Sequence, residues 1–234
     1  TVLIKPNIGW SLPPERAANT NPNLIKRIVE HCVKAGVKKV FVFDNTASHW
    51  EDCYRISGIE RAVKEASGLM VPANLEKYYQ SIEIKGAKNL KKTKVHELYL
   101  EADSIINVPI LKNHWAAGLT ISMKNLMGVV WDRWFYHGNN LNQCIADFCL
   151  IRKPTLNVVD AYNVLMQNGP RGNSVNDVEK KKILIVSADM VAADSAAAKT
   201  FGSEPEKIKH IALASQMKIG SMNLEKLNIK RILI

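Results

Sequence analysis

The stretch that decides the fold is Asn107-Val-Pro-Ile-Leu-Lys-Asn-His-Trp-Ala-Ala-Gly-Leu-Thr-Ile-Ser-Met-Lys-Asn-Leu-Met-Gly128. It is largely apolar, as a protein core is, yet it holds Lys112, His114 and Lys124 and no acidic residue. We expect it to begin in a buried strand, to leave the sheet at Pro109, and to return as a helix that carries Lys124. Burying an ammonium group is costly unless a carboxylate or a bound anion pairs with it. The stretch therefore predicts that acids from elsewhere in the chain, or an anionic ligand, lie beside these lysines.

Short runs of β-branched and other apolar residues indicate five buried strands. They lie at residues 2–4, 39–43, 104–108, 155–159 and 183–186. Segments with the apolar spacing of helices lie between them, and in one of these Asn21 is a predicted N-cap with Pro22 at the first helical position. Strands that alternate with helices predict an α/β fold, with a mostly parallel sheet flanked by helices in a Rossmann-like layering.

The chain has 234 residues, and we expect residues 1–234 to form a single α/β domain. Residues 75–100 interrupt the alternation and predict a small hairpin insertion or subdomain. The chain opens on a strand-like segment without an initiator Met, so we expect the full-length protein to have residues before Thr1. Export with removal of a leader and a cytoplasmic location both stay open. No run approaches the ~20 apolar residues that a membrane span needs.

The net charge of +10 favours an anionic partner. Five lysines fall between residues 85 and 94, which raises the alternative of a basic module that binds nucleic acid or a membrane surface. No aromatic residues are interleaved with these lysines for base stacking, so nucleic acid is not the expected partner. A small anionic molecule fits the charge better.

Polar residues follow the predicted ends of all five strands, and in open parallel sheets ligands bind beyond the carboxyl ends of the strands. We therefore predict a ligand-binding protein or enzyme that acts on an anionic small molecule at this edge. The candidate catalytic residues are Lys124, His114 and Asp160. The candidate ligand-binding residues are Lys5, Asn7, Asp44, Asn45, Lys112, Asn125, Asp189 and Arg171. For Asp44 and Asp160, capping of the following segment is the competing interpretation, and for His114 it is a hydrogen-bonded core histidine.

A metal or iron–sulfur protein that works with an electron-transfer partner is the second alternative. Its ligands would be His137, Cys53 and Cys144. The four cysteines form no Cys-x-x-Cys pair, so the usual zinc-finger and ferredoxin spacings are absent. The sequence also contains no P-loop, dinucleotide-binding or nucleophile-elbow motif.

Ten motifs, in their order along the chain, resemble an uncharacterised prokaryotic family called domain of unknown function 362. They lie at residues 2–7, 19–22, 44–46, 57–59, 101–109, 112–114, 124–128, 159–161, 168–170 and 188–194. The resemblance covers nearly the whole chain and implies no particular reaction. Members of that family are often joined to ferredoxin-type iron–sulfur modules or preceded by twin-arginine export signals, which implies a redox partner or export. This chain lacks the clustered cysteines of the fused modules.

Overall fold

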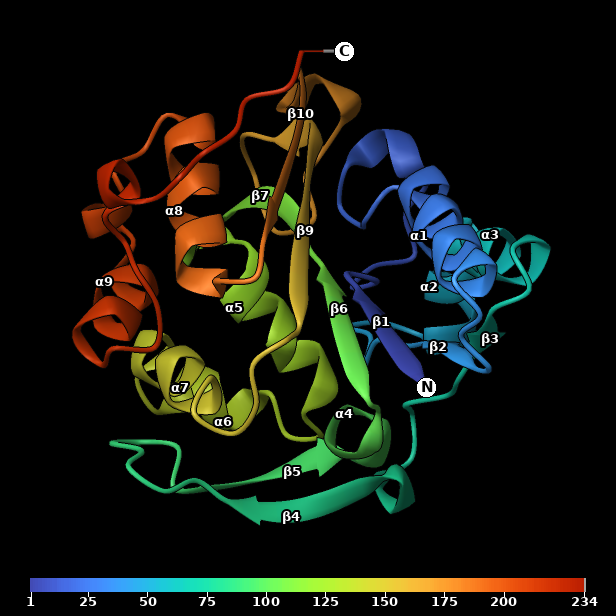
Figure 1. The fold of residues 1–234 in the computed structure, drawn as a ribbon, viewed down its shortest axis with the longest axis horizontal. Helices are drawn as coiled ribbons and strands as arrows, with labels where there is room; N and C mark the ends of the chain where they lie inside the picture. Colours follow the sequence, from blue (N-terminus) through green and yellow to red (C-terminus); the bar gives the residue numbers. More distant parts are fainter. Residues whose placement is uncertain (234) are drawn as a thin grey trace.

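Eight strands form one mixed sheet in the computed structural model, which describes residues 1–233 (Figure 1). The strand order is β3-β2-β1-β6-β9-β7-β8, and β10 pairs with β9. The bounds are β1 Val2–Pro6, β2 Val40–Val42, β3 Leu69–Met70, β6 Ser104–Val108, β7 Ile110–His114, β8 Gly118–Thr120, β9 Leu156–Leu165 and β10 Val178–Ser187. All pairings are parallel except β7 with β8 and β9 with β10. The predicted α/β class with a mostly parallel sheet is confirmed.

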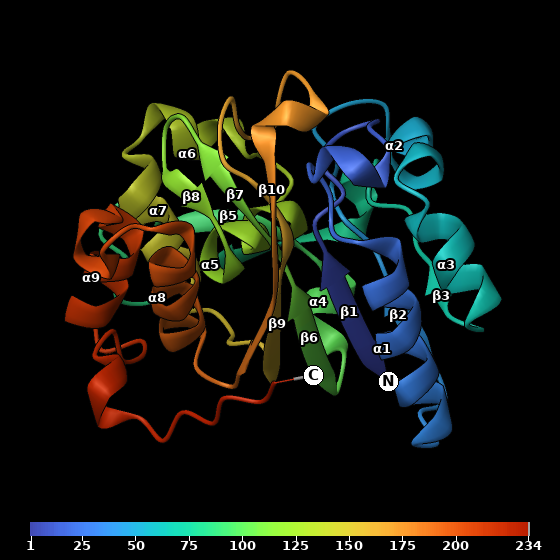
Figure 2. The same cartoon turned by 90° about the horizontal axis from the view of Figure 1, so that it is seen from above.

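Helices cover both faces of this sheet (Figures 1 and 2). One face carries α1 Pro22–Lys34, α2 Trp50–Ile56 and α3 Ile59–Glu65. The other carries α4 Glu97–Glu101, α5 Ser122–Asn125, α6 Trp134–Gly138, α7 Leu141–Phe148, α8 Met190–Phe201 and α9 Lys209–Gln216. Side chains alternate along β1, so Val2 and Ile4 pack toward α1 while Leu3 joins the core on the opposite face. The result is the three-layer arrangement that the sequence predicts.

Helix α1 shows why the local pattern could be interpreted correctly. The Asn21 side chain accepts a hydrogen bond from the Asn23 N–H, as an N-cap does, and Pro22 occupies the first helical position. Ile25 and Val29 are fully buried against the sheet. The predicted cap and the predicted apolar face are both confirmed.

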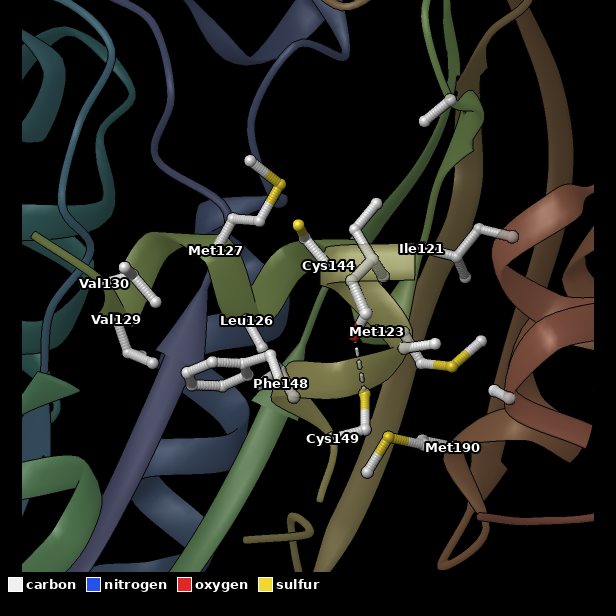
Figure 3. Packing of buried hydrophobic residues seen from close by; sticks show 14 of the residues in the cluster. Ile121, Met123, Leu126, Met127, Val129, Val130, Cys144, Phe148, Cys149 and Met190 are labelled. Atoms are coloured by element: carbon white, nitrogen blue, oxygen red, sulfur yellow. Dashed lines mark hydrogen bonds between the residues drawn. The ribbon is translucent and has the colours of Figure 1, made fainter. Parts of the chain in front are cut away.

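The decisive stretch of sequence behaves differently from the prediction at Pro109. The chain does not leave the sheet there, because β7 continues alongside β9, and the Asp160 N–H donates to the Pro109 carbonyl at 2.9 Å. The helix that follows is short: α5 gives way to a 3-10 turn, η3 Leu126–Val129. Figure 3 shows the apolar residues of α5 and η3, such as Met123 and Leu126, packed beside Phe148 of α7. This core supports the polar residues of the same stretch.

The predicted end of β9 and the predicted direction of β10 were also wrong, and both matter for the site. Strand β9 does not end near residue 159 but runs to Leu165, so Asp160 lies inside it. Strand β10 is antiparallel to β9, with Ser187 opposite Asn157. The residues after β10 therefore lie at the other edge of the sheet from those after β1 and β2.

The predicted hairpin insertion is confirmed as a separate two-stranded antiparallel sheet of β4 Tyr79–Glu83 and β5 Lys92–His96. The Asp147 carboxylate of α7 accepts hydrogen bonds from three consecutive backbone N–H groups, at residues 88, 89 and 90, and so fixes the hairpin to the main body. Within the basic run, Lys94 pairs with Glu76. None of the helices in residues 1–233 is both long and apolar enough to span a bilayer.

Candidate functional site

A cavity of about 540 Å³ opens beyond the carboxyl ends of β1 and β2, beside the β7–β8 hairpin. Figure 2 shows α6 and this hairpin at the same edge of the molecule as α2. The lining residues come from five segments: Asn7, Gly9 and Trp10; Asp44, Asn45 and Ala47; Lys112, His114, Trp115 and Thr120; Lys124, Asn125, Met127, Gly128, Arg133, Trp134 and His137; and Asn168, Pro170 and Arg171. The volume suits a small-molecule ligand.

The wall of the cavity carries an excess of positive charge. Four cationic side chains line it, Lys112, Lys124, Arg133 and Arg171, and among the lining residues the only acid is Asp44. That carboxylate is already engaged, since it forms an ion pair with buried Lys5 at 2.9 Å. The four cations that line the cavity are therefore not neutralised by carboxylates within it.

The Lys5–Asp44 pair is built into the floor. Asp44 also accepts a hydrogen bond from the Ile8 N–H at 2.5 Å, and Lys5 donates to the Pro6 carbonyl at 2.6 Å. Gly128 lies directly against the pair: a Cβ there would stand 1.8 Å from Asp44 Oδ1 and 2.7 Å from Lys5 Nζ. Only glycine allows the backbone to approach a buried ion pair this closely.

Three hydrogen-bonding side chains lie on one face of the β7–β8 hairpin. Lys112 and Thr120 are directly opposite each other in the antiparallel register, so their Cβ atoms are about 5 Å apart. His114 is two residues further along β7 and faces the same way, with Gly118 opposite it. The Thr120 hydroxyl is buried and has no hydrogen-bond partner in the described part of the chain. The hairpin thus presents polar groups to the cavity in a row.

The two lysines of the wall differ in their partners. Lys112 is 2% exposed, and its Nζ donates to Asn7 Oδ1 at 2.9 Å and to the Ala18 carbonyl at 2.5 Å. Burial and the charge of Lys124 lower the pKa of Lys112 to about 7. Lys124 is half-buried, and the one hydrogen-bond partner of its Nζ within residues 1–233 is Met127 Sδ at 3.7 Å. Burial and the neighbouring Arg133 lower the pKa of Lys124 to about 8.

His114 is held as a neutral hydrogen-bond donor. Its Nδ1 accepts from the N–H groups of Ala116 and Ala117 at 3.1 and 3.2 Å, so the ring proton of the neutral form is on Nε2. Burial and the charges of Lys124 and Lys112 lower its pKa to about 2. An imidazole in this state can donate a hydrogen bond from Nε2 to a ligand, but it is poorly placed to accept a proton.

A row of buried asparagines runs beneath the cavity. Asn7 Nδ2 donates to Asn125 at 3.0 Å, and Asn125 Nδ2 donates to Asn107 at 2.8 Å. Asn107 Nδ2 donates to Asn157 at 3.0 Å, and Asn157 Nδ2 donates to the Ser187 carbonyl at 3.3 Å. Sequence reasoning identified Asn7 and Asn125 but missed Asn107 and Asn157. An asparagine inside each of two apolar strands was the available signal, because a buried amide needs partners.

The mouth of the cavity is aromatic. Trp115 and Trp134 are 78% and 84% exposed, and His137 lies between 6.0 and 6.3 Å from both rings. Arg133 binds the backbone carbonyls of Asn45 and Thr46, which ties the segment before α6 to the loop after β2.

Residues 2–199 match the family described as Domain of unknown function (DUF362). The chain belongs to this family. A curated relative, the thylakoid-associated protein sll1697 of Synechocystis sp., is 24% identical over 233 residues, covering 94% of this chain and 68% of the relative. A crystal structure of a protein from Thermotoga maritima superposes with a TM-score of 0.50 at 12% identity. That match covers 92% of this chain and 54% of the other protein, and it shows the fold alone.

Two predicted site residues of this DUF362 chain lie away from the cavity. Asp160, inside β9, accepts hydrogen bonds from the N–H groups of Asn21 and Tyr162, which supports the start of α1. Asp189 follows the antiparallel strand β10, caps α8 and binds the Ser221 N–H at 2.7 Å. Their positions differ from the expectation for two reasons: β9 runs past Asp160 to Leu165, and β10 is antiparallel, which carries Asp189 to the other edge of the sheet.

The predicted metal ligands of the DUF362 chain are not brought together. Cys53 packs in the core on the α1 face of the sheet, whereas Cys144 packs in the core on the opposite face. His137 lines the cavity mouth, away from both thiols. Within residues 1–233, no cluster of three histidine, cysteine or acidic side chains is arranged to hold a metal ion.

Proposed function

We propose that this chain binds an anionic small molecule in the cavity beyond β1 and β2. The observation that carries the proposal is the Lys124 ammonium group, which is half-buried in the wall and whose one hydrogen-bond partner in the described chain is a thioether sulfur. Keeping an ammonium group there without a carboxylate costs stability, and a bound anion removes that cost.

The neighbouring donors support the same ligand. Lys112 keeps one N–H free after its two hydrogen bonds, His114 offers Nε2–H, and the Thr120 hydroxyl has no partner within residues 1–233. An anion in front of these groups accepts several charge-assisted hydrogen bonds at once. Asn7 accepts a hydrogen bond from Lys112, and Asn125 accepts one from Lys5, so these two amides also hold lysine side chains in place.

Within this proposal, proton transfer belongs to Lys124 rather than to His114. Lys124 has a pKa of about 8 and exchanges its proton near neutral pH, whereas His114 stays neutral with its Nδ1 already engaged. His114 therefore orients the ligand. Asp160, which supports α1, has no part in the chemistry.

Calorimetric titration with sulfate and with inorganic phosphate tests the proposal. We expect saturable binding of at least one anion to the wild-type chain, and a loss of about 100-fold in affinity in Lys124→Met. Lys92→Met, which removes the same charge from the exposed hairpin, is the matched control and should leave the affinity unchanged. Equal binding by all three proteins would refute the proposed site. An equal loss of affinity in both variants would assign binding to net charge and would refute it as well.

A further inference from the structure

We propose that the anion bound here is a phosphate monoester that carries a flat aromatic ring, with the phosphate on the β7–β8 hairpin and the ring at the mouth. This inference rests on the proposed anion-binding function and names its ligand class. Three features of the cavity support it: the number of donors, the orientation of the rings at the mouth, and the exposure of those rings.

The donors favour an anion with at least three oxygen atoms. Lys112, His114 and Thr120 lie on one face of the hairpin, and Lys124 stands close enough for its charge to lower the pKa of both Lys112 and His114. A monocarboxylate offers two oxygens to these four side chains, whereas a phosphate monoester offers three terminal oxygens with a double charge. These four donor side chains line the cavity, so a phosphate can be held there without a glycine-rich loop.

Three of the rings at the mouth share one orientation, whereas Trp134 is tilted by 53° to His137. The planes of His114, Trp115 and His137 lie within 18° to 19° of one another, with centroids 6.1 to 6.3 Å apart. A flat group that lies parallel to one of these rings is therefore nearly parallel to all three. Because His114 belongs both to the donor row and to this array, the ring of the ligand comes next to its phosphate.

The exposure of these rings points to something that covers them. Trp115 and Trp134 are 78% and 84% exposed, although buried tryptophan surface contributes strongly to stability. Both rings border the cavity that carries the four cations. Arg171, one of these four cations, lies over the Trp10 ring at 5.9 Å. Aromatic faces beside cations are how proteins hold the ring and the phosphate of one ligand.

Two matched pairs of probes test the ring directly: adenosine 5′-monophosphate against ribose 5-phosphate, and phenyl phosphate against methyl phosphate. We expect the ring-bearing member of at least one pair to bind roughly tenfold more tightly by calorimetry. That preference should vanish in Trp115→Leu combined with Trp134→Leu, while the affinity for the ringless member stays within about twofold. Tyr162→Leu, which removes an exposed aromatic ring outside the cavity lining, is the control.

The outcomes separate this inference from the proposed function. Equal affinity within both pairs, together with binding that depends on Lys124, would overturn the aromatic ligand and keep the anion site. A ring preference that survives the double tryptophan variant would also overturn it. Adenosine that binds as tightly as its monophosphate would overturn the phosphate half. No Lys124-dependent binding of any phosphate probe would overturn the proposed function itself.

Discussion

Replacing Lys124 with Met should stabilise the protein while it weakens anion binding. The pKa of Lys124 falls from 10.5 to about 8, and a difference of this size corresponds to at most about 3 kcal/mol of destabilisation at pH 7. The folded-state pKa lies below the unfolded one, so this cost is fully present below pH 8 and disappears as the pH rises toward 10.5. A methionine side chain fills similar space beside Met127 without the charge.

The loss in binding follows from the same ammonium group. At about 4 Å from an anion, one positive charge contributes about 4 kcal/mol at an effective dielectric constant of 20. Hydration of the free anion and the remaining donors offset part of that, which leaves an expected loss of about 100-fold in affinity. Stability and binding should therefore change in opposite directions.

Urea unfolding at pH 7 and calorimetry with sulfate measure the two effects on the same preparations. We expect a free energy of unfolding that is about 1–3 kcal/mol higher in Lys124→Met, with a gap from wild type that narrows by pH 10. Lys92→Met should change neither quantity. A variant that is less stable than the wild type and binds sulfate normally would show that Lys124 is a structural residue, and the reasoning would be refuted.

Three further predictions concern the floor, the wall and a residue outside the site. Sulfate affinity should be highest below pH 7 and fall as the pH rises past 8, because Lys112 and Lys124 lose their protons at about 7 and about 8; titrations at a series of pH values check this, and a flat profile would count against both lysines. Gly128→Ala should lower the free energy of unfolding by about 2–4 kcal/mol, because the added Cβ would collide with the Lys5–Asp44 pair. Denaturant unfolding measures this loss. A loss below about 0.5 kcal/mol would mean that the backbone and the ion pair can move apart to accommodate the methyl group. Asp160→Ala should lower the free energy of unfolding by about 1–3 kcal/mol, because it leaves the N–H groups of Asn21 and Tyr162 without their acceptor. The same titration should show an unchanged affinity for sulfate. Weakened binding would mean that Asp160 belongs to the binding site.

The sequence carried much of the fold because each local signal was strong. Apolar runs marked five of the strands, and the cap at Asn21 marked the start of α1. The direction of β10 could not be predicted, since an antiparallel strand with apolar residues has the same local pattern as a parallel one. The length of β9 was missed because Asp160 looked like the end of a strand, whereas its carboxylate is satisfied by backbone N–H groups inside the sheet.

Residues of the candidate site could be predicted where a charged side chain occurs within an apolar segment of the sequence. Lys112 and Lys124 stood out because lysines without acids are unusual in an apolar stretch, and both line the cavity. Thr120 gave no such signal, because its unpartnered hydroxyl depends on the β7–β8 register. The exposure of Trp115 could not be predicted either, because it depends on the position of this residue in the β7–β8 turn and not on the neighbouring residues in the sequence.

The hydrogen bonds along the asparagine row beneath the cavity all run in the same donor-to-acceptor direction. A lysine ammonium group can only donate, so Lys112 obliges Asn7 to present its oxygen, and each following amide must then pass its own N–H to the next, as far as the Ser187 carbonyl. Reversing any one amide would set donor against donor on one side and acceptor against acceptor on the other. The hydrogen bonds that begin at Lys112 therefore all point one way, and the amide dipoles are aligned from the cavity edge of the sheet to its far edge.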